Sequence, residues 1–236
     1  MNICDLHTHV LPGVDDGAAT MEYALQMLRN GAASDVSVLA VTPHWGGGYG
    51  MPRDLQTRFE QLKAAAKDIP VRLVLGAEAR ADENLLGQLA QGSIPTINGS
   101  RYLLTEFAPD AKKEDFLSML QSILDLGYVP LVAHPERYEA VCRAPQIVTD
   151  WLDMGCHLQL TGGSILGDYG QTVRRTAACL LKNDLVACIA SDAHSTGHRS
   201  NFLMGVYDHI SVQYSKQYAK CLLWETPMGI CANDRL

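Results

Sequence analysis

The chain carries the sequence VPLVAHPER at residues 129–137, in which a short apolar run ends abruptly in a histidine, a carboxylate and a guanidinium. An apolar run of this length, bounded by polar residues, is typical of a β-strand that is buried on both faces. Such strands occur in parallel sheets covered by helices, where ligands bind at the carboxyl ends of the strands. The stretch therefore predicts one strand of an α/β protein with functional groups at its end.

Six further runs of this kind recur at intervals of about 30 residues, and stretches with helical spacing such as Met21, Leu25 and Leu28 lie between them. The seven expected strands are Ile3–Leu6, Val36–Val41, Val71–Leu75, Tyr102–Thr105, Val129–Ala133, His157–Leu160 and Leu185–Ala190. Consecutive strand–helix units predict a parallel sheet, and seven of them fit a closed or nearly closed barrel better than an open sheet.

Local signals set the expected boundaries. Thr20 is expected to begin the first helix, and Gly31, Gly127 and Gly155 are expected to end helices. The last ten residues look irregular. No Pro/Gly/Ser-rich linker or charge block divides the chain, so we predict a single domain over residues 1–236.

Composition and charge exclude several classes of protein. The chain is 47% hydrophobic and has a formal net charge of −7, so it gains nothing from counterion release on nucleic acid. It shows no signal-peptide pattern and no apolar run of the roughly 20 residues that cross a bilayer. Its seven cysteines contain no C-x-x-C pair, which predicts neither a disulfide framework nor a zinc knuckle. We predict a cytoplasmic protein with no nucleic-acid partner and no membrane insertion.

Residues that bind metals follow six of the seven expected strands, and only the sixth ends without one, at Thr161-Gly162. A barrel brings all these strand ends to one rim, and converging imidazoles and carboxylates are what first-row divalent metals require. The nine candidate ligands are His7, His9, Asp16, His44, Glu78, Glu106, His134, Asp192 and His194. Spacing alone does not separate Asp15 from Asp16.

Each candidate has a simpler explanation when it is taken alone. A single histidine is most often a hydrogen-bonded core residue, and Glu78 or Glu106 is also favourable near a helix N-terminus. Packing does not explain six such strand ends, because unpaired buried charges are costly. Nine donors exceed the needs of one ion, and a carboxylate such as Glu78 can bridge two, so we predict two or three metal ions.

Four other polar residues near these motifs are assigned lesser roles. His157 lies inside an expected strand and His209 in a helical stretch, so we expect both to be packing residues. His198 is a candidate for a residue that contacts the metal ligands without binding a metal ion itself. Glu136 is expected to be a surface or orienting residue.

Arg137 and Arg199 follow candidate ligands by a few residues, which places two guanidinium groups at the same rim. A guanidinium suits the oxygens of phosphate, so the pair favours a phosphate ester as substrate. The alternative for each is a salt bridge to a carboxylate such as Glu136. A cysteine nucleophile is excluded, because no cysteine is followed six residues later by an arginine.

The order of these motifs resembles the polymerase and histidinol phosphatase (PHP) superfamily. It is closer still to the bacterial manganese-dependent protein-tyrosine phosphatases of capsular and exopolysaccharide operons. The matching segments are DLHTHVLPGVDDG at 5–17, TPH at 42–44, SRYLLTEF at 100–107, PLVAHPERY at 130–138 and ASDAH at 190–194. Thr226-Pro227 stands where the family usually has Asn-Pro.

The resemblance implies a distorted, TIM-like (β/α)7 barrel, the PHP fold, holding three divalent metal ions. The ions are often manganese, with iron, zinc, cobalt or magnesium as alternatives. By position, the implied ligand sets are His7, His9, Glu78 and Asp192 for the first ion, Glu78, Glu106 and His134 for the second, and Asp16, His44 and His194 for the third. Arg137 and Arg199 fall where the family binds phosphate. The implied substrate is the phosphotyrosine-rich tail of a membrane-associated tyrosine autokinase that governs polysaccharide export.

The predicted reaction is in-line attack on phosphorus by a hydroxide held between two metal ions, since coordination lowers the pKa of water from about 15.7 towards 7. Arg137 and Arg199 are predicted to stabilise the phosphoryl oxygens. Asp192 and His194 are counted as catalytic with them, although neither is assigned as the general acid. The alternatives are histidinol-phosphate phosphatase or another small-molecule phosphoesterase, an amidohydrolase, and a non-catalytic metal-binding module. The oligomeric state stays open.

Overall fold

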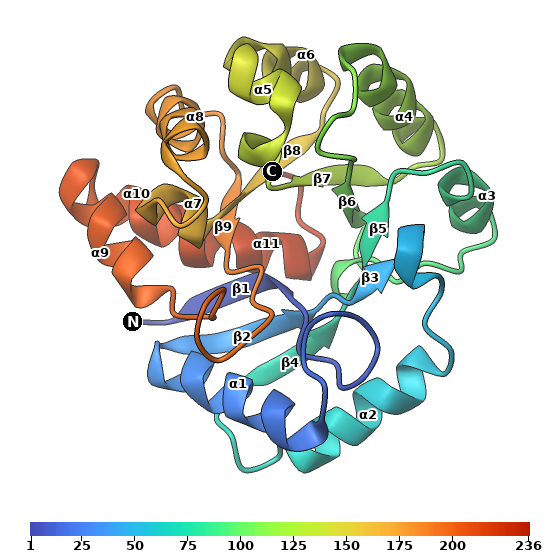
Figure 1. The fold of residues 1–236 in the computed structure, drawn as a ribbon, viewed down its shortest axis with the longest axis vertical. Coiled ribbons are helices and arrows are strands. Elements are labelled where there is room, and N and C mark those ends of the chain that lie inside the picture. The colour runs from blue at the N-terminus through green and yellow to red at the C-terminus, as the bar shows by residue number, and fades with distance from the viewer.

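A computed structural model describes residues 1–236 as a ring of strands surrounded by helices (Figure 1). The strands are β1 (Ile3–Thr8), β2 (Val36–Val41), β3 (His44–Trp45), β4 (Arg72–Leu75), β5 (Glu78–Arg80), β6 (Tyr102–Glu106), β7 (Val129–Ala133), β8 (His157–Thr161) and β9 (Cys188–Ala190). The helices are α1 (Met21–Ala33), α2 (Leu55–Ala65), α3 (Leu85–Ala90), α4 (Lys113–Asp125), α5 (Glu139–Arg143), α6 (Val148–Asp153), α7 (Gly162–Leu166), α8 (Gln171–Lys182), α9 (Met204–Gln213), α10 (Lys216–Lys220) and α11 (Thr226–Ala232). None of the helices has the length and apolar character that crossing a membrane requires.

The strands pair only in parallel, in two sheets of order β1-β2-β4 and β3-β5-β6-β7-β8-β9. A parallel bridge between Thr8 and Ala193 joins the end of β1 to the segment after β9 and brings the two edges of the ring together. The strands β3 and β5 continue β2 and β4 after short breaks. Seven strand–helix units therefore form a distorted barrel, and the predicted α/β (β/α)7 fold is confirmed.

The distortion has a local cause in the two broken strands. Pro43 follows β2 and has no backbone N–H, while Gly76 follows β4. The pairing survives across both breaks, because Gly76 N donates to Val41 O and Glu78 N donates to Pro43 O, both at 3.0 Å. The break thus turns the strand ends without separating them, and it brings His44 and Glu78 into register as neighbours.

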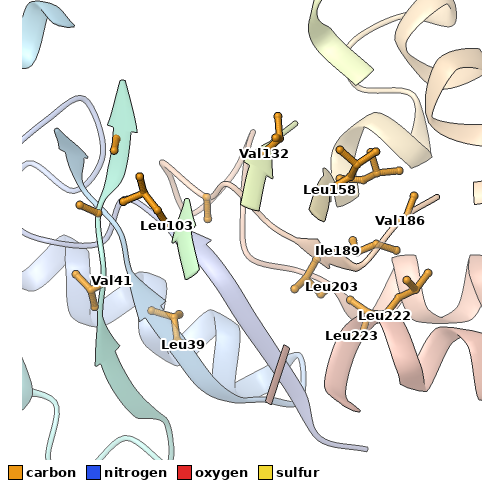
Figure 2. Packing of buried hydrophobic residues seen from close by; sticks show 14 of the residues in the cluster. Leu39, Val41, Leu103, Val132, Leu158, Val186, Ile189, Leu203, Leu222 and Leu223 are labelled. Atoms are coloured by element: carbon orange, nitrogen blue, oxygen red, sulfur yellow. The ribbon is translucent and has the colours of Figure 1, made fainter. Parts of the chain in front are cut away.

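The hydrophobic core has two layers. An outer cluster of 47 buried residues lies between the strands and the helices, and it includes Leu39, Leu103 and Leu158 (Figure 2). An inner cluster of 13 residues fills the barrel and includes Leu104 of β6. Ile230 of α11 belongs to this inner cluster, so the last helix packs against one end of the barrel interior. The polar side chains gather at the other end.

Three of the expected helix boundaries are confirmed. Thr20 caps α1, and its hydroxyl accepts a hydrogen bond from Tyr23 N at 3.2 Å. Gly127 and Gly155 follow α4 and α6 with φ of 86° and 98°, the left-handed conformation that commonly ends a helix.

Two boundary predictions are wrong. Gly31 does not end α1, which runs on to Ala33, because Gly31 is needed for packing instead: a Cβ there would lie 2.5 Å from Asn201 Nδ2. The last ten residues are not irregular throughout, since α11 extends to Ala232. Pro227 lies at the start of α11, which continues directly from a π-helical turn at Cys221–Glu225.

Candidate metal centre

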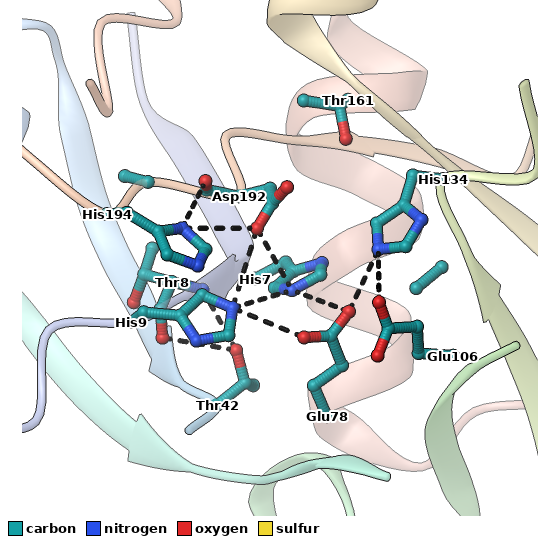
Figure 3. Close-up of polar contacts among 12 residues, drawn as sticks. His7, Thr8, His9, Thr42, Glu78, Glu106, His134, Thr161, Asp192 and His194 are labelled. Atoms are coloured by element: carbon teal, nitrogen blue, oxygen red, sulfur yellow. Dashed lines mark hydrogen bonds and ion pairs between the residues drawn. The ribbon is translucent and has the colours of Figure 1, made fainter. Parts of the chain in front are cut away.

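All nine predicted ligands lie together at the carboxyl end of the barrel, where His7, His9 and Asp192 face Glu78 (Figure 3). The two Nε2 atoms of His7 and His9 are 3.1 Å apart. Each lies 3.3 Å from one oxygen of Glu78, and Asp192 Oδ1 lies 3.5 and 3.4 Å from them. Neighbouring ligands on a tetrahedral ion with bonds of about 2.1 Å are about 3.4 Å apart, so this spacing fits a metal ion.

Glu78 also contacts two histidines on its other sides. Its Oε1 lies 2.9 Å from His134 Nε2, and its Oε2 lies 2.9 Å from His44 Nδ1. Glu106 lies beyond, with its oxygens 3.9 and 4.0 Å from the same two ring atoms. The central position of Glu78 is what a carboxylate that bridges two ions requires.

The third group consists of Asp16, His44 and His194. Asp16 Oδ1 lies 3.4 Å from His44 Nε2 and 3.3 Å from His194 Nε2. His194 Nε2 is buried and has no hydrogen-bond partner, so a ligand-type atom points at this position with nothing to satisfy it. Ligand-type atoms of His9, Asp16, His44 and His194 lie within 4.8 Å of one another.

Hydrogen bonds fix the orientation of three of the imidazoles. His7 Nδ1 donates to Gln159 Oε1 at 2.9 Å, and His194 Nδ1 donates to the carbonyl oxygen of Asp192 at 2.9 Å. His9 Nδ1 donates to Asp15 Oδ2 at 2.8 Å. In each case the outer nitrogen carries a proton and Nε2 faces the centre, which is the orientation of most metal-binding histidines.

Asp15 and Asp16 thus occupy different positions, although spacing did not separate them. Asp15 is turned away from the centre, where it accepts hydrogen bonds from His9, His44 N and Gly17 N. Burial opposes its ionisation, but these hydrogen bonds outweigh burial and hold its pKa at about 2. Asp16 instead points between His44 and His194. The geometry favours Asp16 as the ligand and Asp15 as the residue that holds His9.

Opposite charges balance within the centre. Burial opposes ionisation of Glu78, but the charge of His7 and hydrogen bonds from His134 and His44 hold its pKa well below the ordinary value. Burial likewise opposes ionisation of Asp192, but His7, His9 and Arg137 keep its pKa well below that of an ordinary aspartate. Both carboxylates are therefore ionised at neutral pH and available to a cation.

Two guanidinium groups converge on Asp192 from the side opposite the histidines. Arg137 Nη1 and Arg199 Nη2 donate to Asp192 Oδ2 at 2.7 and 2.9 Å. The expected alternative, a salt bridge to a carboxylate, is therefore formed by both arginines, but with Asp192 and not with Glu136. The remaining N–H groups on Arg137 Nε, Arg137 Nη2 and Arg199 Nε are buried without a hydrogen-bond partner. Their hydrogen-bonding capacity is therefore not used by the protein.

A protein family described as "Capsular polysaccharide synthesis, CpsB/CapC" matches residues 3–232. The chain belongs to the CpsB/CapC family. A relative in this family, the tyrosine-protein phosphatase CpsB of Streptococcus pneumoniae, is 31% identical over 235 residues, which cover 96% of this chain and 97% of that protein. The tyrosine-protein phosphatase YwqE of Bacillus subtilis is 28% identical over 200 residues, or 83% of this chain and 79% of that protein.

Solved structures agree with this membership. The fold matches that of "YwqE from Bacillus subtilis and CpsB from Streptococcus pneumoniae, unique metal-dependent tyrosine phosphatases" with a TM-score of 0.91 and 25% identity, covering 98% of this chain and 95% of that one. The phosphotriesterase homology protein of Escherichia coli matches with a TM-score of 0.64 and 12% identity over 98% of both chains, which shows a shared fold alone. The resemblance inferred from the motifs is confirmed at the level of the CpsB/CapC family.

Several residues that support the centre in this CpsB/CapC chain were missed by the sequence analysis. Gln159 comes from β8, the one strand that ends without an ionisable group. A single amide side chain within the mainly apolar run His157–Thr161 could have indicated that Gln159 has a role in the site. Buried Asp5 accepts a hydrogen bond from Ser191 N at 2.9 Å, and Arg80 Nη1 lies 2.9 Å from Glu106 Oε2.

The residues assigned lesser roles divide as follows. Glu136 is not at the surface: it is fully buried and accepts a hydrogen bond from Thr161 N at 2.9 Å, so it orients the end of β8. His157 lies at the start of β8, with its ring 5.9 Å from that of Tyr102, away from the centre. His209 lies in α9, and His198 is exposed in the segment after β9.

The glycine of the Asp-Asp-Gly motif has a steric role that leads to a prediction. A Cβ on Gly17 would lie 1.9 Å from His9 O, so Gly17→Ala forces the loop away from His9. We expect the free energy of unfolding to fall by about 1–3 kcal/mol, as in other overpacked sites, and the metal content to fall with it. Thermal denaturation and elemental analysis measure both. Gly48→Ala is the matched control, because no atom lies within 4 Å of its added Cβ; equal melting temperatures for the two variants would contradict the prediction.

Proposed function

We propose that this chain is a metal-dependent tyrosine-protein phosphatase whose single domain, residues 1–236, hydrolyses phosphotyrosine. The observation that carries the proposal is Asp192, which faces His7 and His9 through Oδ1 and binds both arginines through Oδ2. One carboxylate thereby joins a cluster of metal-type ligands to two phosphate-type donors. The similarity to tyrosine-protein phosphatases along almost the entire chain supports this reading.

The proposed cofactor is a set of three divalent ions, with manganese as the first choice. Following the predicted sets, His7, His9, Glu78 and Asp192 hold one ion, Glu78, Glu106 and His134 a second, and Asp16, His44 and His194 the third. The spacing of the donor atoms and the unsatisfied His194 Nε2 support the assignment. When bound, such ions lower the pKa of water and stabilise negative charge on phosphoryl oxygens.

The side chains around the ligands supply orientation. Gln159 and Asp15 hold His7 and His9 in the tautomer that exposes Nε2. Gln159 is itself fixed, because its amide nitrogen donates to Leu160 O at 2.7 Å. Partners of this kind commonly contribute 10- to 100-fold in metal affinity or activity.

Arg137 and Arg199 are proposed to bind the phosphoryl oxygens with their free N–H groups. Their hydrogen bonds to Asp192 hold both guanidinium groups at the edge of the ligand cluster, so little ordering remains when substrate binds. The leaving group of phosphotyrosine is a phenolate with a pKa of about 10, which needs less protonation than an alkoxide. Asp192 and His194 belong to the catalytic set through these contacts, and no residue is assigned as the general acid.

The proposed physiological substrate is the phosphotyrosine-rich tail of a membrane-associated tyrosine autokinase, met in the cytoplasm. The family description, capsular polysaccharide synthesis, supports a role in the production of capsular polysaccharide.

Chelation tests the proposed function. Exhaustive chelation of the purified protein is expected to abolish hydrolysis of a phosphotyrosine peptide, and added Mn²⁺ is expected to restore it, because the ligands alone provide no nucleophile. Release of inorganic phosphate is the measurement, with the matching phosphoserine peptide as comparison. Undiminished turnover in protein that elemental analysis shows to be free of metal would rule out the mechanism.

A further inference from the structure

A cavity of about 320 Å³ is lined in part by Arg199 and by Tyr169, whose ring lies against Arg137. It lies between α7, the segment after β9 and the start of α9, and its walls include Leu166, Tyr169, Arg199, Phe202 and Val206. Its volume is at the lower end of the range of about 300–1,000 Å³ that is typical of small-molecule sites. The proposed function assigns nothing to it.

The cavity opens directly beside the groups that are proposed to bind phosphate. Arg199 lies in its wall and also donates to Asp192. Tyr169, another wall residue, lies with its ring centroid 4.0 Å from the guanidinium carbon of Arg137. A ligand whose anionic end reaches both arginines therefore has its neighbouring atoms inside this cavity.

The rim of the cavity is apolar and unusually exposed. Phe202 is 59% exposed and Leu166 is 41% exposed, although they come from segments far apart in the sequence. Both lie beside Gly205, where an added Cβ would be 3.6 Å from the Phe202 ring and 4.0 Å from Leu166 Cδ1. Two exposed apolar side chains side by side at the edge of a charged site are a feature of ligand-binding grooves.

The wall formed by the start of α7 has no side chains of its own. A Cβ on Gly162 would lie 2.9 Å from Val206 Cγ2, and a Cβ on Gly163 would lie 2.8 Å from Asp168 Oδ2. Val206 and Leu203 leave no room for a Cβ at Gly162, whereas at Gly163 only the end of the Asp168 side chain would have to move. The cavity is thus bounded by bare backbone on one side and by the Tyr169 and Phe202 rings on others, which suits a flat ligand.

We propose that this cavity receives the phenyl ring of the phosphotyrosine substrate, with Phe202 and Leu166 as its specificity-determining contacts. The inference rests on the proposed function. An aryl phosphate places an apolar ring next to its anionic group, and here a cavity with Leu166, Phe202 and Val206 in its walls lies next to the guanidinium group of Arg199. An alkyl phosphate gains nothing from such a recess, so the cavity selects aryl over alkyl phosphates.

Removal of the exposed ring tests the proposal. Phe202→Ala is expected to raise the inhibition constant of phenylphosphonate about tenfold, which corresponds to about 1.4 kcal/mol. The inhibition constant of methylphosphonate is expected to rise by no more than about twofold. The KM values for phenyl phosphate and for a phosphotyrosine peptide are expected to rise together. Phe202→Tyr, which keeps the ring, is expected to retain wild-type values. Val212→Ala, which removes an 80% exposed apolar side chain from α9, is the control for surface truncation.

The outcomes separate the cavity from the function. A wild-type protein that hydrolyses neither phenyl phosphate nor the peptide removes the proposed function itself. An active wild type together with equal shifts for both phosphonates, or no shift for either, overturns the cavity assignment alone. A KM that rises for the peptide but not for phenyl phosphate also overturns it, because the cavity then holds a neighbouring residue of the peptide.

Discussion

Replacement of Glu78 by alanine is expected to remove bound metal and activity together. Glu78 is only 1% exposed and contacts His7, His9, His44 and His134, so its loss leaves four imidazoles without their shared carboxylate. A residue that bridges two ions weakens both when it is lost. We expect kcat on a phosphotyrosine peptide to fall by at least about 1,000-fold, or about 4 kcal/mol in transition-state stabilisation. Elemental analysis of the same preparation is expected to show metal depletion.

A matched pair of variants separates this effect from loss of the fold. Glu78→Gln keeps the volume and one acceptor oxygen, so it is expected to remain folded by circular dichroism while still losing metal. Glu60→Ala, on the exposed face of α2, removes a carboxylate that contacts only Gln56 and Lys63, and it is expected to behave as wild type. Full metal occupancy in folded Glu78→Gln protein would refute the bridging role of Glu78.

Arg137→Ala and Arg199→Ala are expected to leave the metal content near wild type while cutting turnover. A guanidinium stays protonated in proteins and cannot be a metal ligand. Each arginine instead offers donors to the phosphoryl group, and loss of one stabiliser of transition-state charge costs about 2–4 kcal/mol, or about 30- to 1,000-fold in kcat. Steady-state kinetics on phosphotyrosine peptides measure the effect.

Arg143→Ala is the matched control for both arginine variants, because its guanidinium pairs only with Glu139 on the surface of α5. Its kinetics are expected to be those of wild type. If the Arg137 and Arg199 variants also keep normal kinetics, the phosphate-binding role is wrong, and the substrate of the metal centre has to be sought outside phosphate esters. Metal loss in either variant would instead show that Asp192 depends on its arginine partners to bind metal.

Most of the barrel could be predicted because its strands are continuous apolar runs. The breaks at Pro43 and Gly76 were also visible as residues that interrupt a strand, but their effect depends on partners in a neighbouring strand. Gly31 was predicted to end a helix and does not. A glycine late in a helical stretch is typical of a helix end, yet here Asn201, 170 residues further on, leaves no room for a Cβ.

The position of the site could be predicted for those strands that alternate regularly. On β6, Tyr102 and Leu104 belong to the inner cluster, so a period of two places Glu106 inside as well. The position of Glu106 follows from the pattern alone. Cys188 of β9 also belongs to the inner cluster, but β9 ends at Ala190, and Asp192 reaches the centre through a left-handed backbone with φ of 53°.

Alternation fails on two strands. On β1, Cys4 and Leu6 face the interior, yet His7 and His9 also reach the centre; the pairing with β2 is irregular between Asp5 and Thr8, and such irregularities turn side chains. On β7, Ala133 faces inward and the next residue, His134, reaches the centre through a left-handed backbone with φ of 36°. These histidines were predicted from their position just after expected strands, which does not depend on alternation. Nothing local to Gln159 or Arg80 identifies their partners, which lie 152 and 26 residues away.

The left-handed backbone of His134 is shared by Asp192, with φ of 53°, and Arg199, with φ of 59°. A residue with a Cβ is less stable in this conformation, at about 1–3 kcal/mol each, and the cost persists only where the surroundings impose it. The backbone conformation of these three residues therefore lowers the thermal stability of the barrel. Selection for heat resistance alone is expected to favour glycine or asparagine at these positions. The resulting proteins would be more stable to heat but would no longer turn over substrate.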